Sequence, residues 1–187
     1  MNKVKYNLKN THYAKQEVAE DGTITYAKPV PIPGSVSISL EAQGSVDKFY
    51  ADGIVYYTSS TNNGYEGELE IAMLPESFRI DILGEELDSK KVLIEKADSK
   101  QSNFALLFEF DGDVKAIRNV LYNCTASRPA VESNTRTDTI EPVTEKFTVT
   151  ATALPDGRIK GRTGDTTDDA AYSSWYDAVH MTTGGAA

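Results

Sequence analysis

The stretch that decides the fold reads Tyr65-Glu66-Gly67-Glu68-Leu69-Glu70-Ile71-Ala72-Met73. Its odd-numbered positions carry aromatic, apolar or small residues, and three even-numbered positions carry glutamate. A period of two places successive side chains on opposite faces of a β-strand. We therefore expect a strand with one buried face, and with a row of three glutamates on the other face: Glu66, Glu68 and Glu70.

Two further strands are expected before this stretch. Val36, Ile38 and Leu40 alternate with polar residues, and a β-rich run covers 54–58. Between the second run and Tyr65 lie six small polar residues: Ser59, Ser60, Thr61, Asn62, Asn63 and Gly64. Such residues favour turns and loops. We interpret the unit as a long hairpin loop at about 52–65, with these six residues as its flexible tip.

The first 34 residues are interpreted as an N-terminal arm. Asp21-Gly22 separates the β-rich runs 13–18 and 23–26, which predicts a hairpin. Alternate prolines at 29, 31 and 33 then force an extended backbone. This segment is either a stiff connector within one domain or a polyproline ligand for a partner, and we favour the connector.

After the glutamate row, the pattern changes to a short helix. Pro75–Leu83 has proline in the first turn, Phe78 and Ile82 on one face, and Gly84 at the position after the helix. The charged segment 85–101 is expected to be a loop with a short strand at 92–95. Runs 104–110 and 115–127 predict two strands joined at Asp111-Gly112-Asp113.

The C-terminal third predicts strands at 139–154, with a break near Pro142, and at 158–162. A second helix is expected over 168–180, because the four largest apolar residues recur with helical spacing: Tyr172, Trp175, Tyr176 and Val179. Thr166 and Asp169 have the spacing of a capping box. The whole chain, 1–187, is therefore expected to form one mainly β domain, a β-sandwich or partial barrel with one or two short helices.

Composition excludes several classes of protein. The only cysteine is Cys124, so no intrachain disulfide can form, and folding in a reducing cytoplasm is expected. No run is apolar and long enough for a secretion signal or a membrane span, and no membrane partner is expected. The net charge of −9 argues against a basic face for duplex DNA. Most of the acidity lies in residues 65–113, which hold thirteen acidic residues against five basic ones.

Catalytic and cofactor patterns are weak. The two histidines, His12 and His180, lie near opposite ends of the chain without a nucleophile motif, and Cys124 is interpreted as a core residue. There is no zinc pattern and no glycine-rich phosphate loop, so no cofactor is expected. The oxygen-rich run at 164–169 is better explained by a helix cap than by an EF-hand, although a weak cation site near Asp165 and Asp169 stays open.

The glutamate row has three readings. It is a solvated strand face, a functional acidic surface, or the carboxylate pair of a glycosidase. The glycosidase reading needs a sugar-binding cleft, and neighbouring carboxylates on an open strand do not form one. On the residues alone, a solvated strand face is favoured, a functional acidic surface is the second choice, and the glycosidase is the third.

Several runs resemble the major tail proteins of siphophages and prophages of Gram-positive bacteria, and the resemblance extends almost from end to end. The N-terminal run 3–14 and the run 31–40 are similar to the corresponding parts of that family. So are five later runs: Phe49-Tyr50-Ala51-Asp52, Asn62-Asn63-Gly64-Tyr65-Glu66-Gly67-Glu68-Leu69-Glu70, Phe78-Arg79 with Asp81-Ile82-Leu83-Gly84, Phe104–Gly112, and Tyr122–Pro129. Their order and spacing together make the resemblance specific.

The resemblance implies a structural virion protein of the phage tail and not an enzyme. Subunits of this family form hexameric rings that stack into a hollow tube, with an inner barrel completed by all six copies. The tube conducts DNA, which passes transiently and without sequence recognition. Other expected partners are the tape-measure protein and the tail terminator or distal tail proteins, and assembly is expected in the cytoplasm of the host bacterium. The C-terminal immunoglobulin-like domain of some relatives is not expected after residue 187.

Three surfaces are assigned on this basis. The glutamate row is expected to line the lumen, where like charge keeps DNA from adhering. The six polar residues from Ser59 to Gly64 are expected to contact the next ring. The N-terminal arm is expected to reach a neighbouring subunit by strand addition, through Tyr6, Leu8, Tyr13, Ile24 and Tyr26. A carbohydrate-binding or adhesin-like β-sandwich remains the main alternative, and a β-sandwich hydrolase is third.

Overall fold

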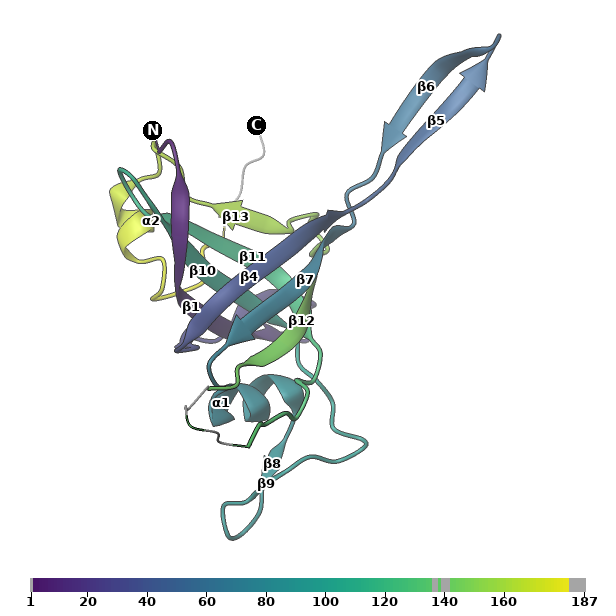
Figure 1. The fold of residues 1–187 in the computed structure, drawn as a ribbon. Coiled ribbons are helices and arrows are strands. Elements are labelled where there is room, and N and C mark those ends of the chain that lie inside the picture. Colours follow the sequence, from purple (N-terminus) through teal and green to yellow (C-terminus); the bar gives the residue numbers. More distant parts are fainter. Residues whose placement is uncertain (1, 136–137, 139–141, 182–187) are drawn as a thin grey trace.

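The computed structural model describes residues 2–135, 138 and 142–181 and is mainly β, with 47% strand and 7% helix (Figure 1). The main sheet is antiparallel and has the order β2-β1-β10-β11-β12-β7-β4, with β3 paired to β1 and β13 paired to β11. Its strands are β1 (Lys5–Val18), β2 (Ile24–Tyr26), β3 (Val30–Pro31), β4 (Ser35–Gln43), β7 (Gly64–Ile71), β10 (Phe104–Gly112), β11 (Ile117–Ala126), β12 (Glu145–Thr152) and β13 (Lys160–Arg162).

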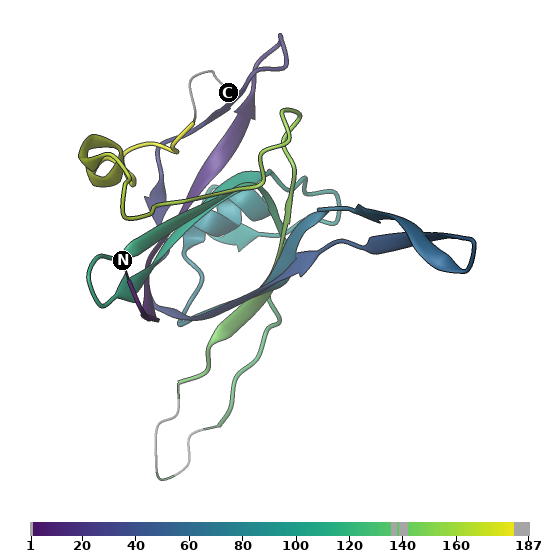
Figure 2. The same cartoon turned by 90° about the horizontal axis from the view of Figure 1, so that it is seen from above.

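The sheet folds over itself into two layers without closing into a barrel (Figures 1 and 2). β4, β7 and β12 form one layer, and β1, β10 and β11 form the other. Apolar side chains from both layers meet in the first core, including Leu69 of β7, Leu106 of β10 and Val149 of β12. This arrangement confirms the predicted β-sandwich class.

A short helical segment covers one end of the sandwich, as the sequence predicts. It consists of α1 (Glu76–Phe78), which continues into a π-helical turn, η1 (Arg79–Leu83). Phe78 and Ile82 are fully buried in the first core. Gly84 ends the segment in the left-handed conformation, with φ of 76°, which glycine adopts without strain.

The alternation predicted for residues 65–73 is confirmed in β7, with one correction. Leu69 and Ile71 are buried, whereas Glu66 and Glu68 are exposed. Met73 does not share the buried face, because the strand ends at Ile71 and Met73 is 73% exposed.

Strands β4 and β7 approach closely enough to require glycine at one position. A Cβ added to Gly67 would lie 1.8 Å from the carbonyl oxygen of Ser39. Because glycine has no side chain at this position, the backbones of β4 and β7 can approach to this distance.

A second core lies on the other face of β10 and β11. It contains Leu107 and Val120, and the C-terminal segment covers it with Trp175 and Val179. The predicted helix at 168–180 is mostly wrong, because α2 spans only Asp169–Ser173. The hydroxyls of Ser173 and Ser174 donate to carbonyls four residues earlier and compete with continued helix.

The predicted capping box is also wrong. The N-cap residue of α2 is Asp168, whose Oδ1 accepts hydrogen bonds from the backbone N–H groups of Ala170 and Ala171 at 2.9 and 3.1 Å. A carboxylate at the N-cap satisfies two amide groups that the helix leaves unpaired. Thr166 lies two residues too early for this role.

The predicted hairpin tip is misplaced. β5 (Val46–Ala51) and β6 (Ile54–Ser60) pair in a two-stranded ribbon that projects far from the sandwich, and its tip is Asp52-Gly53 (Figure 1). Both tip residues have positive φ, 52° and 77°, as tight hairpin turns require. Ser59 and Ser60 instead belong to β6, and residues 61–63 lie at the base of the ribbon.

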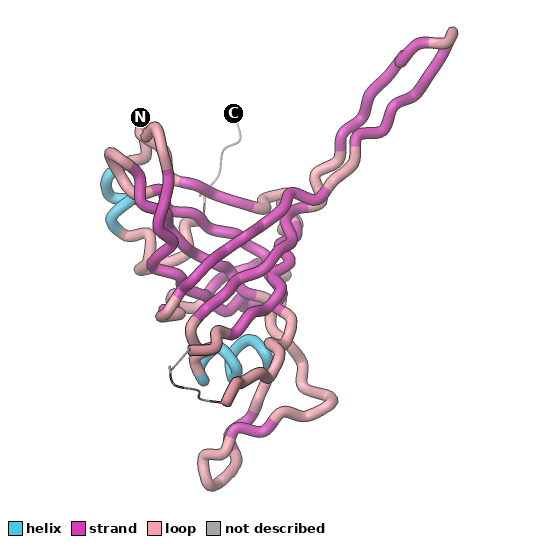
Figure 3. The backbone as a smooth tube through the Cα atoms, viewed as in Figure 1, coloured by secondary structure: helices cyan, strands magenta, loops and turns pink. Residues whose placement is uncertain are grey.

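The remaining predicted elements are largely confirmed. β8 (Glu86–Leu87) and β9 (Leu93–Ile94) form a small pair in the 85–101 loop. β10 and β11 are joined two residues later than predicted, since β10 ends at Gly112 and β11 begins at Ile117. β12 begins only at Glu145, and residues 139–141 of the predicted strand lie outside the described residues. The backbone tube in Figure 3 shows how few residues are helical.

Candidate assembly surfaces

An acidic face covers the outer side of the β4–β7–β12 layer. It consists of the three predicted glutamates of β7 together with Glu41 of β4, which lies directly opposite Glu66. Like charges opposed across a strand pair destabilise a sheet. The described residues supply one nearby ammonium group, Lys146 of β12, at 3.6 Å from Glu68 and 3.8 Å from Glu70. The face therefore keeps an excess of negative charge.

Serine and threonine hydroxyls fill the rest of this face. Thr144 and Ser37 donate hydrogen bonds to the carboxylate of Glu70 at 2.6 and 2.9 Å. These bonds, that from Thr144 first, hold the pKa of Glu70 below its ordinary value. The face thus offers hydroxyls and carboxylates, which water solvates well, and its carboxylates repel a polyanion.

The β5–β6 hairpin is the most apolar exposed surface of the described chain. Phe49 lies opposite Tyr57, and Tyr50 lies opposite Val55. Seven large apolar side chains of the hairpin are between 44% and 71% exposed: Val46, Phe49, Tyr50, Ile54, Val55, Tyr56 and Tyr57. An isolated two-stranded ribbon is marginally stable in water, and a contiguous exposed apolar surface marks an interaction site.

The predicted ring-contact residues from Ser59 to Gly64 form the base of this hairpin. The N–H of Thr61 donates to Ser45 O at 2.9 Å, and that of Asn63 donates to Gln43 O at 2.8 Å. Asn62 Oδ1 accepts from the N–H of Gly64 at 3.1 Å. These bonds fix the segment at the base of the hairpin. The contact of residues Ser59 to Gly64 with another ring stays a prediction.

The predicted inter-subunit arm is built into its own subunit. Tyr13 is buried in the first core and donates to Asp81 Oδ2 at 2.7 Å. Tyr26 donates to the carbonyl of Tyr122 at 2.7 Å, and Ile24 packs against the second core. Burial raises the pKa of Tyr13 to about 12.

The other two predicted arm residues differ from each other. Leu8 packs against the first core, while Tyr6 is exposed. The segment is not free in the subunit, because β1 pairs with β10 from Lys5 to Lys15. Strand addition to a neighbour through this arm stays untested.

The structure does not assemble a nucleophile from the predicted candidates. Cys124 is fully buried, as predicted, and burial raises the pKa of its thiol to about 12. His12 stacks on Tyr176 with ring centroids 4.6 Å apart, and its Nδ1 lies 2.8 Å from Asn10 O. His180 stacks on Trp175. Both histidines therefore make packing contacts.

A buried polar cluster was not predicted. Glu109 is 3% exposed and accepts from Arg118 Nε and from the hydroxyl of Tyr176, each at 3.1 Å. Arg118 stacks on Tyr172 with its guanidinium carbon 3.9 Å from the ring centroid. The cluster ties the C-terminal segment to the sheet. An acid inside the apolar run 104–110 was the available signal in the sequence.

Other kinds of site lack support in the described part of the chain. Within it, no three His, Cys, Asp or Glu side chains are arranged to hold a metal ion. The cation site left open near Asp165 and Asp169 gains no support from this arrangement, and Lys115 Nζ lies 3.6 Å from Asp169 Oδ1. No helix among residues 2–135, 138 and 142–181 is long and apolar enough to cross a membrane.

The fold and these surfaces define a structural β-sandwich subunit with an apolar extension that a monomer leaves uncovered. The chain belongs to the phage tail tube protein family, whose family model matches residues 2–179. This family is a structural one, and membership places the protein in the tail of the virion, where family members assemble into a tube. No curated protein matches the chain.

Proposed function

We propose that this chain polymerises as stacked hexameric rings and that the resulting tail tube conducts DNA during infection. The observation that carries the proposal is the β5–β6 hairpin, whose apolar side chains have no partner surface within the described part of their own subunit. Covering them in a neighbouring subunit removes this apolar area from water, which favours association. The family match supports the same conclusion.

The acidic face supports the role of conduit. A ring brings six copies of the face around one axis, and their carboxylates give the channel a negative potential. DNA carries one negative charge per ~1.7 Å of duplex, so a channel of like charge passes it without adhesion. We place Glu66, Glu68 and Glu70 on the wall of the lumen on this ground. Catalysis has no role in this function.

Ends of the tube need other proteins. A ring at either end leaves one set of contact surfaces uncovered, so terminator and distal tail proteins are proposed partners there. The tape-measure protein is the proposed occupant of the lumen before DNA enters.

The hairpin is tested by removing its apolar character without removing its strands. In the variant Phe49→Thr/Tyr50→Thr/Tyr56→Thr/Tyr57→Thr, threonine keeps β propensity. We expect a soluble subunit with unchanged thermal unfolding and at least tenfold less polymer in a sedimentation assay. A matched control, Val92→Thr, alters an exposed apolar residue of the 85–101 loop and should polymerise as the wild type does. Polymer at the wild-type level from the hairpin variant would refute the proposed role.

The lumen assignment is tested by charge reversal. Lysine at Glu66, Glu68 and Glu70 should permit tubes to form but slow DNA ejection, because a cationic wall holds the polyanion. Infectivity and an ejection rate at the wild-type level would show that the acidic face does not line the lumen.

A further inference from the structure

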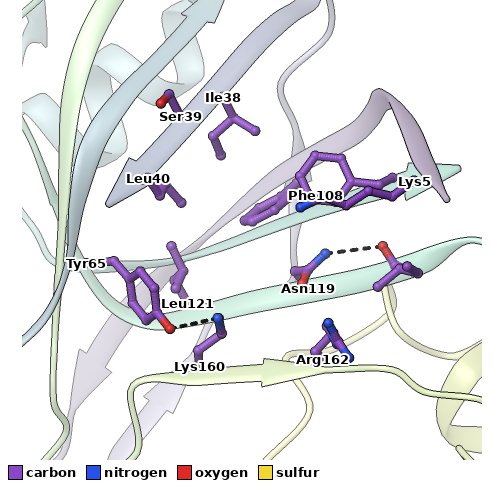
Figure 4. A pocket seen from close by; sticks show the side chains of 12 residues that line it. Lys5, Ile38, Ser39, Leu40, Tyr65, Phe108, Asn119, Leu121, Lys160 and Arg162 are labelled. Atoms are coloured by element: carbon purple, nitrogen blue, oxygen red, sulfur yellow. Dashed lines mark hydrogen bonds between the residues drawn. The ribbon is translucent and has the colours of Figure 1, made fainter. Parts of the chain in front are cut away.

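The sandwich is open at the end away from α1 and η1. There the two layers diverge and leave a groove of about 360 Å³ (Figure 4). Its floor is apolar and includes Phe108 and Leu121 of the first core, while Ile38 and Leu40 of β4 form one wall. Phe78 and Ile82 close the opposite end of the core. One end of the sandwich is therefore covered by a helical segment, and the other end is open.

The rim of the groove is cationic. Lys160 and Arg162 extend from β13, and Lys5 extends from the beginning of β1. No aspartate or glutamate of the described chain lines the groove. Lys160 Nζ donates to the hydroxyl of Tyr65 at 2.8 Å, and Lys5 Nζ lies 5.0 Å from the ring centroid of Phe110. Among the described residues, none of these three cations forms an ion pair.

This combination selects a particular kind of occupant. An apolar floor accepts aromatic or aliphatic side chains, and a rim of three unpaired cations favours carboxylates. A groove of this volume holds a few side chains and not a folded domain, since pockets for small ligands measure ~300–1,000 Å³. The occupant is therefore a narrow, apolar and acidic segment.

The β5–β6 hairpin has this chemistry. It carries seven exposed apolar side chains, and its charged residues are Asp47, Asp52 and a single lysine, Lys48. In its own subunit the hairpin points away from the sandwich, so it does not reach the groove of the same chain. The charge of the hairpin is opposite to that of the groove, and both surfaces are apolar.

We propose that the groove receives the β5–β6 hairpin of a second copy of this chain. Aromatic side chains of the hairpin fill the floor and close the open end of the sandwich, and its two aspartates pair with Lys5 and Arg162. This inference rests on the proposed function and specifies which surface of the neighbouring subunit is bound. It makes the hairpin and the groove the two halves of one heterologous contact, which propagates from subunit to subunit.

Charge exchange between the two halves tests the pairing. The groove variant Lys5→Glu/Arg162→Glu and the hairpin variant Asp47→Lys/Asp52→Asn should each reduce polymer at least tenfold. Asparagine is used at Asp52 because it tolerates the positive φ of the turn. All four substitutions in one chain should restore polymer at least tenfold over the groove variant alone, because the pair at position 47 is regained with reversed sign and the neutral Asn at position 52 repels neither new glutamate. Thermal unfolding of each variant should match the wild type, since Lys5 and Arg162 are exposed.

Cross-linking tests the location independently. Tyr56→Cys/Arg162→Cys places one thiol on the hairpin and one on the rim, and buried Cys124 does not compete. A short bismaleimide should then produce a ladder of covalent multimers on a denaturing gel. The control Lys90→Cys/Arg162→Cys moves the first thiol to the 85–101 loop and should give no ladder.

The outcomes separate this inference from the proposed function. Wild-type protein that forms no polymer would overturn both. If the wild type polymerises, three results would each overturn the groove as the receptor and leave the tail tube intact. These are normal polymerisation of the groove variant, no rescue in the variant with all four substitutions, and a ladder from the Lys90 control only.

Discussion

Arg118 Nε lies 3.1 Å from Glu109 Oε2 in a site where the glutamate is almost fully buried. The pair joins adjacent strands β10 and β11, and Tyr176 adds a hydrogen bond to the same carboxylate oxygen. Because Tyr172 and Tyr176 belong to the C-terminal segment, the ion pair couples that segment to the centre of the sheet.

Breaking this pair should destabilise the subunit strongly. Arg118→Leu leaves the carboxylate of Glu109 buried, with the ammonium group of Lys9 at 3.7 Å as its remaining cationic neighbour in the described chain. We expect the free energy of unfolding in urea to fall by about 3–5 kcal/mol. The control Lys146→Ala removes ion pairs of the exposed acidic face and should cost at most ~1 kcal/mol. Equal losses from the two variants would contradict the importance of burial.

The close approach of β4 and β7 predicts a second effect. Gly67→Ala places a Cβ against the backbone of Ser39, which cannot move without separating the strands. The expected cost is about 3 kcal/mol, the upper end for overpacking. Gly22→Ala is the matched control, because it has positive φ but open space, and it should cost about 1–2 kcal/mol. Thermal unfolding measures both, and a smaller loss for Gly67→Ala would contradict the close spacing of the two strands.

The thiol of Cys124 should report on folding. It is buried with a pKa raised to about 12, so the native protein should resist iodoacetamide at about pH 8, where an exposed cysteine reacts. In concentrated urea the same thiol should label completely. Rapid labelling of the native subunit would show that the first core opens locally at β11.

Acid should weaken the subunit partly through Glu70. Its pKa is lowered in the folded state, so the stabilising hydrogen bonds are fully present above about pH 4.3, the ordinary value for glutamate. They are lost as the pH falls through the lowered folded-state pKa. Glu70→Gln should therefore flatten the dependence of melting temperature on pH between about 5 and 3. A slope in Glu70→Gln equal to that of the wild type would contradict this contribution.

The sequence predicted the sandwich because its strands alternate and its turns carry Asp-Gly pairs. The small polar residues from Ser59 to Gly64 predict the hairpin tip in the wrong place, because Asp52-Gly53 supplies the two positive φ angles that the turn requires. The exposure of Phe49 and Tyr57 could not be predicted from one chain, since aromatic strands ordinarily face a core.

The C-terminal region shows a different limit. Trp175 and Val179 were assigned correctly to an apolar surface, but to a helix that ends at Ser173. Contacts with β10 and β11 hold these residues in irregular backbone, so tertiary packing overrides the helical period. The cationic groove is assembled from β1, β4, β7, β10, β11 and β13, and no local pattern brings those strands together.

We propose that the chain is a ring-forming subunit whose acidic face lines a channel. Cryo-electron microscopy of the purified wild-type polymer tests it most directly. We predict six copies in each stacked ring, with Glu66, Glu68 and Glu70 on the channel wall and the β5–β6 hairpin seated on a neighbouring copy. A population of monomers only, or a polymer with these glutamates on its outer surface, would contradict the account.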